Sequence, residues 1–352
     1  MSHQTSQGIK GLALVAVIAI VGCSAPKTEL ATESVAGDIT AYTIPSLGSD
    51  PQGIVAGPDG NLWFTEQKAN KIAKVTTSGA FTEFAIPTDG SSPTGIAVGP
   101  DGNLWFTEGE ASQVAKITTS GVITEYVIPT PKSRPHGITA GPDGNMWFTE
   151  SAGNKVAKVT TSGVITEYSV PTVRGGSSPY GISAGPDGNL WFTEYWGEKV
   201  AKITTSGMIT EYAVPGKASP TPRGIAAGPD GNLWITYASG IFSGFVAKVS
   251  TSGVITAHEA SGVQDVITSG PDGNLWVMSD SITKEGHPSD VVVKVTPSGK
   301  FVEYTFPLLD YPSRSGGITL GPDRNLWFTE GAGSSSDWGA NVRYKVLKLR
   351  PY

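Results

Sequence analysis

The sequence predicts an all-β fold: a seven-bladed β-propeller with four-stranded blades, the last of which is closed by the N-terminal strand. The first observation is a repeated unit, Gly-Pro-Asp-Gly-Asn-Leu-Trp-Phe-Thr-Glu, that occurs seven times with small variations. The second is its spacing of 42 to 51 residues, close to the roughly 40–45 residues of a four-stranded propeller blade. The seven tryptophans of the unit are Trp63, Trp105, Trp147, Trp191, Trp234, Trp276 and Trp327.

Each repeat divides into four strand-like pieces. The Gly-Pro-Asp-Gly-Asn segment separates the first two pieces and Thr-Ser-Gly separates the last two; Pro fixes φ for a turn and Gly accepts a positive φ. The 45 glycines and 25 prolines of the chain fit many such turns. In the first complete repeat the strands are expected at 53–56, 62–66, 71–76 and 80–86.

The two ends of the repeated region match different strands of one blade. Residues 39–45 resemble the fourth strand of a repeat, whereas residues 344–349 resemble the third. The N-terminal strand is therefore expected to complete the last blade, which would tie both ends into the ring. The predicted propeller spans residues 38–352.

The N-terminus predicts a targeting segment over residues 1–22. The apolar run 12–21 is too short to span a bilayer, and it ends at Gly22-Cys23, as at a bacterial lipoprotein cleavage site. Cys23 is the only cysteine, so it is the expected lipidation site and no disulfide can form. The alternative is an ordinary signal peptide with an incidental cysteine. Residues 23–37 would be a tether, giving an extracytoplasmic, membrane-anchored bacterial lipoprotein.

The charge pattern excludes a nucleic-acid partner. The net charge is −6, and lysines and arginines recur singly along the repeats without forming a concentrated basic face. We expect a monomer that binds a small molecule or peptide at one mouth of the central channel.

Counting outward from each turn predicts which residues line that mouth. The first-strand position differs in every blade, as expected for residues that face a ligand, and comprises Gln52, Thr94, His136, Tyr180, Arg223, Asp265 and Gly316. If the hairpins contain no bulge, each is opposed across the ladder by a second-strand residue on the same face. That opposed series is Glu66, Glu108, Glu150, Glu194, Tyr237, Ser279 and Glu330.

The repeated glutamates allow two interpretations. In the first, each carboxylate forms hydrogen bonds within its own blade, which explains why it recurs in five blades. In the second, the carboxylates face a cation at the channel mouth, with Mg²⁺ or, second, Ca²⁺ relieving their repulsion. His136 is the only histidine at a ring position and would lie opposite Glu150. Arg134, two residues earlier, could bind an anion or a carbonyl group.

Three inserts interrupt the repeats. They lie after the second strand of blades 5, 6 and 7, at 238–244, 280–290 and 331–343. They are expected at the same end of the ring as the glutamates, where loops often carry specificity.

The repeats resemble those of the virginiamycin B lyase (streptogramin B lyase) family over residues 38–352. The similarity rests on Pro-His-Gly-Ile-Thr-Ala-Gly at 135–141 and Leu-Trp-Phe-Thr-Glu at 190–194. It extends to the segments that follow in each repeat, Lys-Ile/Val-Thr-Thr-Ser-Gly and Ile-Thr-Glu-Tyr-x-x-Pro. The resemblance implies a carbon–oxygen lyase that opens a cyclic ester by elimination with Mg²⁺.

The resemblance assigns roles in two ways. If blade 3 is catalytic, His136 handles the proton and Glu150 holds the metal, while Arg134 replaces the second metal-binding glutamate and Thr94 replaces the neighbouring histidine. If blade 4 is catalytic, Glu194 holds the metal, while Ser178 and Tyr180 replace the glutamate and the histidine.

Three functions follow from these observations. The first is a lyase of this family acting on a cyclic ester. The second is a non-catalytic envelope module that binds a ligand or a protein at the channel mouth. The third is a metal-dependent lactonase.

Overall fold

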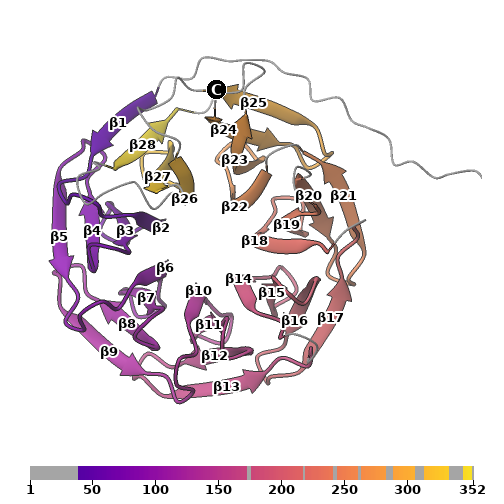
Figure 1. The fold of residues 1–352 in the computed structure, drawn as a ribbon, viewed down its shortest axis with the longest axis horizontal. Helices are drawn as coiled ribbons and strands as arrows, with labels where there is room; N and C mark the ends of the chain where they lie inside the picture. Colours follow the sequence, from indigo (N-terminus) through magenta and orange to yellow (C-terminus); the bar gives the residue numbers. More distant parts are fainter. Residues whose placement is uncertain are drawn as a thin grey trace, which may run out of the picture.

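The structure, a computed structural model, is a closed ring of β-sheets around a central channel (Figure 1). It describes residues 39–172, 176–216, 219–240, 244–260, 263–282, 288–305, 313–332 and 344–350. Within these ranges it contains seven four-stranded antiparallel sheets, which confirms the predicted propeller. No helix in the described part of the chain is long and apolar enough to cross a membrane. The predicted signal segment, Cys23 and the tether lie outside the described residues.

The strands follow the chain outward in each blade, from the channel to the rim. Blades 1 to 3 comprise β2 (Pro51–Ala56), β3 (Leu62–Glu66), β4 (Lys71–Val75), β5 (Phe81–Ala85); β6 (Pro93–Val98), β7 (Leu104–Glu108), β8 (Gln113–Ile117), β9 (Ile123–Val127); and β10 (Pro135–Ala140), β11 (Met146–Glu150), β12 (Lys155–Val159), β13 (Ile165–Ser169). Blades 4 and 5 comprise β14 (Pro179–Ala184), β15 (Leu190–Glu194), β16 (Lys199–Ile203), β17 (Ile209–Ala213); and β18 (Thr221–Ala227), β19 (Leu233–Ala238), β20 (Gly244–Val249), β21 (Ile255–Glu259). Blades 6 and 7 comprise β22 (Val263–Ser269), β23 (Leu275–Ile282), β24 (Pro288–Val295), β25 (Phe301–Thr305); and β26 (Ser313–Leu320), β27 (Leu326–Ala332), β28 (Lys345–Leu349), β1 (Ile39–Thr43).

The ring is closed by the N-terminal strand, as the sequence predicted. β1 pairs antiparallel with β28, with Ile39 opposite Leu349 and Thr43 opposite Lys345. Tyr42 stacks on Trp327, with ring centroids 5.6 Å apart. The last blade is thus assembled from the two ends of the propeller, which leaves no unpaired terminal strand at the closure.

The tryptophan of each repeat is buried in the core of its blade. In blade 1 the indole N–H of Trp63 donates to Asp59 in the turn before it, at 2.9 Å. Lys74 lies over the indole ring and also approaches Asp59, with Nζ 3.8 Å from Oδ2. The same lysine donates to the carbonyl of Thr119 in blade 2 at 3.2 Å. One cluster therefore fixes the turn, the blade core and the contact with the next blade.

The closure is testable because Tyr42 and Tyr126 occupy equivalent positions. Tyr126 stacks on Trp105 at the same 5.6 Å, within a blade that is continuous in the chain. Tyr42→Ala and Tyr126→Ala should each lower the free energy of unfolding by about 2 kcal/mol, because each removes an aromatic stack from a buried tryptophan. Chemical denaturation measures both; a cost for Tyr126→Ala with none for Tyr42→Ala would contradict closure by β1.

Candidate functional site: the channel mouth

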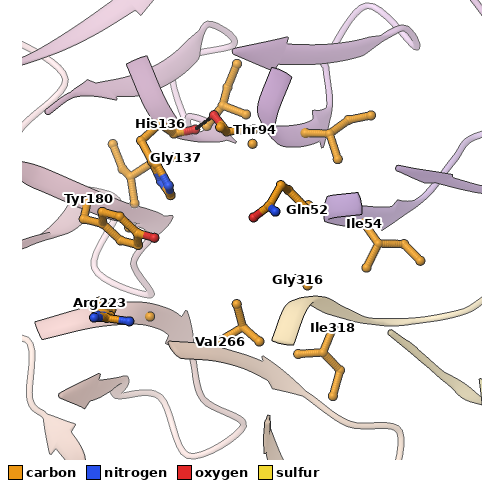
Figure 2. A pocket seen from close by; sticks show the side chains of 18 of the residues that line it. Gln52, Ile54, Thr94, His136, Gly137, Tyr180, Arg223, Val266, Gly316 and Ile318 are labelled. Carbon is orange, nitrogen blue, oxygen red and sulfur yellow. Dashed lines mark hydrogen bonds between the residues drawn. The ribbon is translucent and has the colours of Figure 1, made fainter. Parts of the chain in front are cut away.

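The central channel holds a cavity of about 470 Å³ that is lined by the innermost strands of all seven blades (Figure 2). Its polar ring contains the side chains of Gln52, Thr94, His136, Tyr180 and Arg223, together with Gly316. An isoleucine two residues further along each strand forms the adjoining apolar ring, which consists of Ile54, Ile96, Ile138, Ile182, Ile225, Ile267 and Ile318. The predicted ring position therefore lines the channel in six blades. The seventh residue, Asp265, belongs to β22, but its side chain is outside the described set.

The expected pairing of His136 with Glu150 is wrong. Pro135, not His136, lies opposite Glu150, and the ladder next pairs Ile138 with Phe148. The residues between, His136 and Gly137, form a bulge. The same shift occurs between the first two strands of five other blades. In blade 6 the shift lies at the same place but contains one more residue, because Val263 pairs with Ser279 and Ile267 with Val277. Because a bulge inserts an unpaired residue and redirects the strand, it turns the imidazole toward the channel instead of across the sheet from the carboxylate.

In every blade except blade 6, where Met278 takes its place, a threonine in the second strand lies beside the bulge. In blade 3, the amide of Gly137 donates to Oγ1 of Thr149 at 3.0 Å, and this hydroxyl donates to the carbonyl of Tyr180 in blade 4 at 2.7 Å. A side chain at Gly137 would place its Cβ 2.6 Å from that carbonyl oxygen, so this position requires glycine. The bulge thus couples the direction of each ring residue to the neighbouring blade.

The repeated glutamates lie inside the blades and not in the channel. Glu66, Glu108, Glu150 and Glu194 have no exposed surface, and none of them lines the cavity. Burial, together with the nearby carboxylates of Glu167 and Glu211, raises the pKa of Glu150 to about 8 and that of Glu194 to about 7. At neutral pH, Glu150 is therefore largely protonated and Glu194 is about half protonated, which favours a role within the blade.

The predicted metal ligands do not fit a magnesium site at the mouth. Glu150 and Glu194 belong to separate blades, point away from the cavity and carry raised pKa values, whereas Mg²⁺ requires ionised oxygen ligands around one point. In the described part of the chain, no three His, Cys, Asp or Glu side chains gather in a way that could hold a metal ion. The groups available for chemistry at the mouth are therefore the side chains of the polar ring.

His136 lies in the channel in its neutral form. Its imidazole stacks on Tyr180, with ring centroids 3.7 Å apart and an interplanar angle of 28°. Burial, with a smaller effect of the positive charge of Arg223, lowers the pKa of His136 to about 4. Figure 2 shows the imidazole and the phenol side by side on the wall formed by blades 3 and 4.

The stacking continues from Tyr180 to the surface. Tyr180 contacts Tyr195, with centroids 6.1 Å apart, and Tyr195 meets Trp196 edge to face at 4.6 Å. The guanidinium of Arg223 lies over the ring of Tyr195 and donates to its hydroxyl at 3.2 Å. These residues, His136, Tyr180, Tyr195, Trp196 and Arg223, form one surface that we call the aromatic wall. Trp196 is 62% exposed, so the wall extends from the channel to solvent.

The opposite side of the mouth is polar and acidic. Gln52 donates to Oδ1 of Asp50 at 3.2 Å, and Lys68 lies 3.4 Å from Oδ2 of the same residue. Asp50 and Gln67 both line the cavity. The mouth therefore carries a cation on the aromatic wall and a carboxylate across from it.

Other residues predicted for the site contribute less to the mouth. Arg134 is on the surface, outside the cavity lining, where it forms a 3.0 Å ion pair with Glu110. Thr94 is 9% exposed, and its hydroxyl bonds that of Thr107 at 2.8 Å, so it contributes mainly to the bulge. Of the inserts, 280–290 includes a continuation of the β23–β24 hairpin to Ile282 opposite Pro288; residues 241–243, 283–287 and 333–343 are outside the described residues.

Sequence reasoning missed Asp50, Gln67 and Val266 as lining residues. Val266 occupies the position that is glycine in the other six blades, and it points into the channel (Figure 2). The signal that could have revealed the bulges is that glycine itself, because an interior glycine in a strand commonly marks a bulge or a close backbone approach.

Comparison with known proteins decides the family. A sequence profile of the Virginiamycin B lyase family matches residues 25–182 and 173–336. The chain belongs to the virginiamycin B lyase family. A streptogramin B lyase structure aligns with 30% identity and a TM-score of 0.75, covering 89% of this chain and 98% of that one. A catalytically inactive histidine-to-alanine variant of the Staphylococcus aureus virginiamycin B lyase, solved with quinupristin, aligns with 31% identity and a TM-score of 0.76, covering 89% and 99%.

The match to lactonases is limited to the fold. A structure described as a gluconolactonase aligns at 13% identity with a TM-score of 0.54 over 88% of this chain and 92% of that one. The virginiamycin B lyase family assignment therefore rests on the repeats and on the two lyase structures.

The buried glutamates make stability depend on pH. Glutamate in the unfolded chain titrates near pH 4.3, roughly the ordinary value, whereas Glu150 and Glu194 titrate at about 8 and 7 when folded. A raised folded-state pKa stabilises the fold at low pH, and this contribution is lost as the pH rises through 7 and 8. Without divalent cations, the free energy of unfolding should therefore fall between pH 5.5 and pH 8.5.

Denaturation of the Glu150→Gln variant provides the check. The variant should show a smaller pH dependence than the wild type, because the neutral amide removes one titrating group. The exposed Glu110→Gln variant is the matched control and should retain the full dependence. A wild-type stability that increases over this pH range would rule out the protonated state.

Proposed function

We propose that this virginiamycin B lyase family member binds a small peptide-like ligand at the channel mouth. An aromatic or planar amide group of the ligand would pack on the aromatic wall, and a carbonyl or carboxylate oxygen would face Arg223. The observation that carries this proposal is the continuous contact from His136 through Tyr180 to Tyr195, with Arg223 held over the last ring.

The wall is suited to binding because it is already ordered. Tyr180 lies between two other rings, and Arg223 is oriented by Tyr195, so little side-chain entropy remains to be lost when a ligand binds. Aromatic surfaces and arginine are the side chains that most often dominate recognition. The acidic side of the mouth, at Asp50, would accept an N–H donor of the same ligand.

The family supports a peptide-like ligand. The S. aureus relative is described with quinupristin, and it aligns with almost the whole propeller of this chain. A cyclic peptide ester presents aromatic groups, carbonyl oxygens and amides together, which matches the chemistry of the two sides of the mouth.

A second candidate is elimination from a cyclic ester, and the neutral state of His136 favours it. A neutral imidazole can take the proton from a carbon that is activated by a neighbouring amide carbonyl and is bonded to the carbon that carries the ester oxygen. The bond between that second carbon and the ester oxygen then breaks, which leaves an alkene and a carboxylate. Arg223 influences the charge of His136 and lines the same cavity, so it could stabilise the oxygen that gains negative charge. With a pKa of about 4, the imidazole is a weak base, so we place binding first.

The lipoprotein prediction is part of the proposal, and the position of Ile39 supports one direction for the anchor. Ile39 lies level with Leu349 and Leu326, next to the turn that follows Leu320. The ring residues lie at the other end of the innermost strands. A tether that precedes Ile39 would therefore leave from the face opposite the mouth, and the site would point away from the membrane.

Binding and turnover can be separated with one compound. Quinupristin should bind the wild type saturably in calorimetry, and Tyr180→Ala and Arg223→Gln should each weaken binding at least tenfold, about 1.4 kcal/mol. Arg134→Gln is the control, because Arg134 lies outside the cavity, and it should bind as the wild type does. Absence of saturable binding to the wild type would contradict a peptide-like ligand.

Chromatography with mass spectrometry tests the second candidate on the same samples. Ring opening by elimination changes the retention of quinupristin without changing its mass, since no atom leaves, whereas hydrolysis adds a water. An unshifted mass with changed retention, lost in His136→Ala, supports elimination. Binding with unchanged retention would support the binding function and contradict the elimination reaction.

Anchoring predicts a fractionation pattern. The wild-type protein expressed in a bacterium should sediment with membranes and incorporate labelled palmitate, because Cys23 would be acylated. Cys23→Ser should lose the label. Palmitate incorporation in Cys23→Ser, or none in the wild type, would contradict lipidation at this residue.

A further inference from the structure

The turns at one end of the strands form a face of the propeller that lies opposite the channel mouth. One row of paired residues borders both turns of blade 1 and runs through Ala56, Leu62, Val75 and Phe81. Both turns therefore leave the sheet at the same end, whereas the ring residue Gln52 lies toward the other end of β2. We call the face formed by these turns the base. It comprises residues 57–61, 76–80, 99–103, 118–122, 141–145, 160–164, 185–189, 204–208, 228–232, 250–254, 270–274, 296–300, 321–325 and 350.

Four exposed apolar side chains occupy one position of the base. They follow the Ser-Gly turn in four successive blades and are between 62% and 67% exposed: Val122, Val164, Met208 and Val254. Single exposed apolar residues are common on protein surfaces, but these four are most of the seven large apolar side chains that are exposed in the described chain. The outer strands that follow them, β9, β13, β17 and β21, occupy one continuous side of the ring (Figure 1). The base therefore has an apolar side that spans blades 2 to 5.

The turn does not require an apolar side chain at this position. In blade 3 the amide of Val164 donates to Oγ1 of Thr160 at 3.0 Å, and the amide of Thr160 donates to the carbonyl of Val164 at 3.0 Å. The same side-chain bond holds Ala80 in blade 1 and Lys300 in blade 6, again at 3.0 Å. Because the hydrogen bonds use only backbone atoms of this residue, its apolar character in four blades is a property of the surface and not of the turn.

The other side of the base carries an excess of positive charge. Each blade has an aspartate in its first turn, and all seven lie within 3.8 Å of a lysine from the third strand of the same blade, so these charges balance. Three more cations are exposed and form no ion pair with another described residue: Lys300 in blade 6, Arg324 in blade 7 and Arg350 after β28. The described turns of the base contain no further charged residue. The base is thus positive in a chain whose net charge is −6.

We propose that the base docks onto a membrane surface that contains anionic phospholipids. The three cations would contact the negatively charged headgroups, and the four apolar side chains would enter the boundary between headgroups and acyl chains. A bilayer fits better than a protein partner because the cations and the apolar residues lie on different sides of the ring and do not form one patch. A planar lipid surface can contact both sides at once.

This inference extends the proposed anchor and gives it a second contact. Ile39, the first residue of β1, adjoins the base in the last blade, so a lipid on Cys23 would hold the same face near the bilayer. The apolar residues belong to blades 2 to 5, on the other side of the ring. Contacts on both sides would limit the tilt of the propeller and keep the channel mouth directed away from the membrane.

Sedimentation with lipid vesicles tests the proposal without the anchor. The chain from residue 24 onward lacks Cys23 and the apolar segment before it but retains every strand of the propeller, including both closing strands. It should bind vesicles of equal parts phosphatidylglycerol and phosphatidylcholine at least tenfold more tightly than vesicles of phosphatidylcholine alone. Raising NaCl from about 0.1 M to about 1 M shortens the Debye length from about 10 Å to about 3 Å and should weaken binding at least tenfold. No binding to the anionic vesicles, or equal binding to both kinds, would overturn the proposal.

Two variants of the base separate the two kinds of contact. Val122→Ser/Met208→Ser removes apolar surface and should weaken binding to the anionic vesicles at least threefold. Arg324→Gly/Arg350→Ser removes two cations and should weaken it at least tenfold, with a smaller dependence on salt. Glycine occupies the position of Arg324 in the other six blades, and the φ of 63° at Arg324 suits glycine, so the turn should be retained. Chemical denaturation checks that both variants unfold as the parent does.

A matched variant on the mouth side is the control. Leu47 and Val127 are 48% and 72% exposed; Leu47 lies between β1 and β2, and Val127 ends β9 opposite Gln113, at the end of the blade away from the base. Leu47→Ser/Val127→Ser should bind vesicles as the parent does. An equal loss in this control, or no loss in either base variant, would overturn the proposal. Both base variants should still bind quinupristin as the parent does, so loss of vesicle binding with quinupristin binding retained concerns the base and not the channel mouth.

Discussion

One hydroxyl group, that of the threonine in the second strand of every blade except blade 6, determines how the channel is built. It accepts the amide of the bulge glycine in its own blade and donates to the carbonyl of the ring residue in the next, as Thr149 does between Gly137 and Tyr180. The same donor links Thr65 to Thr94, Thr107 to His136, Thr193 to Arg223 and, across the closure, Thr329 to Gln52. Because the backbone of the ring residue is held by the preceding blade, its side chain can change without loss of the architecture.

Blade 6 lacks both partners of this interaction. Met278 replaces the threonine, and Val266 replaces the glycine. The side chain of Val266 lines the channel. Among the described side chains, the channel is therefore not seven-fold symmetric: blades 3 to 5 supply rings and a guanidinium, whereas blades 6 and 7 supply an aliphatic side chain and a glycine. We propose that ligand recognition is concentrated on the aromatic wall for this reason.

The sequence was sufficient for the architecture because the features that determine it are local and repeated. Trp63 with Asp59 and Lys74 is a cluster that can be read from one repeat, and the match of residues 39–45 to a fourth strand predicted the closure. It was not sufficient for the register. Counting from the turn placed His136 opposite Glu150, but a hydrogen bond from Gly137 to Thr149 and a close contact with Tyr180 shift the ladder. That contact joins residues in different blades, so no single repeat displays it.

The same shift favours the first interpretation of the repeated glutamates, in which each carboxylate serves its own blade. The bulge directs the ring residues inward and leaves the glutamates within the blades, where burial favours their protonated form. Recurrence in five blades therefore reflects a requirement of the blade, while variation from Gln52 to Arg223 reflects the channel. The candidate site of this repeat protein thus appears where the repeat is broken, at ring residues that vary from blade to blade.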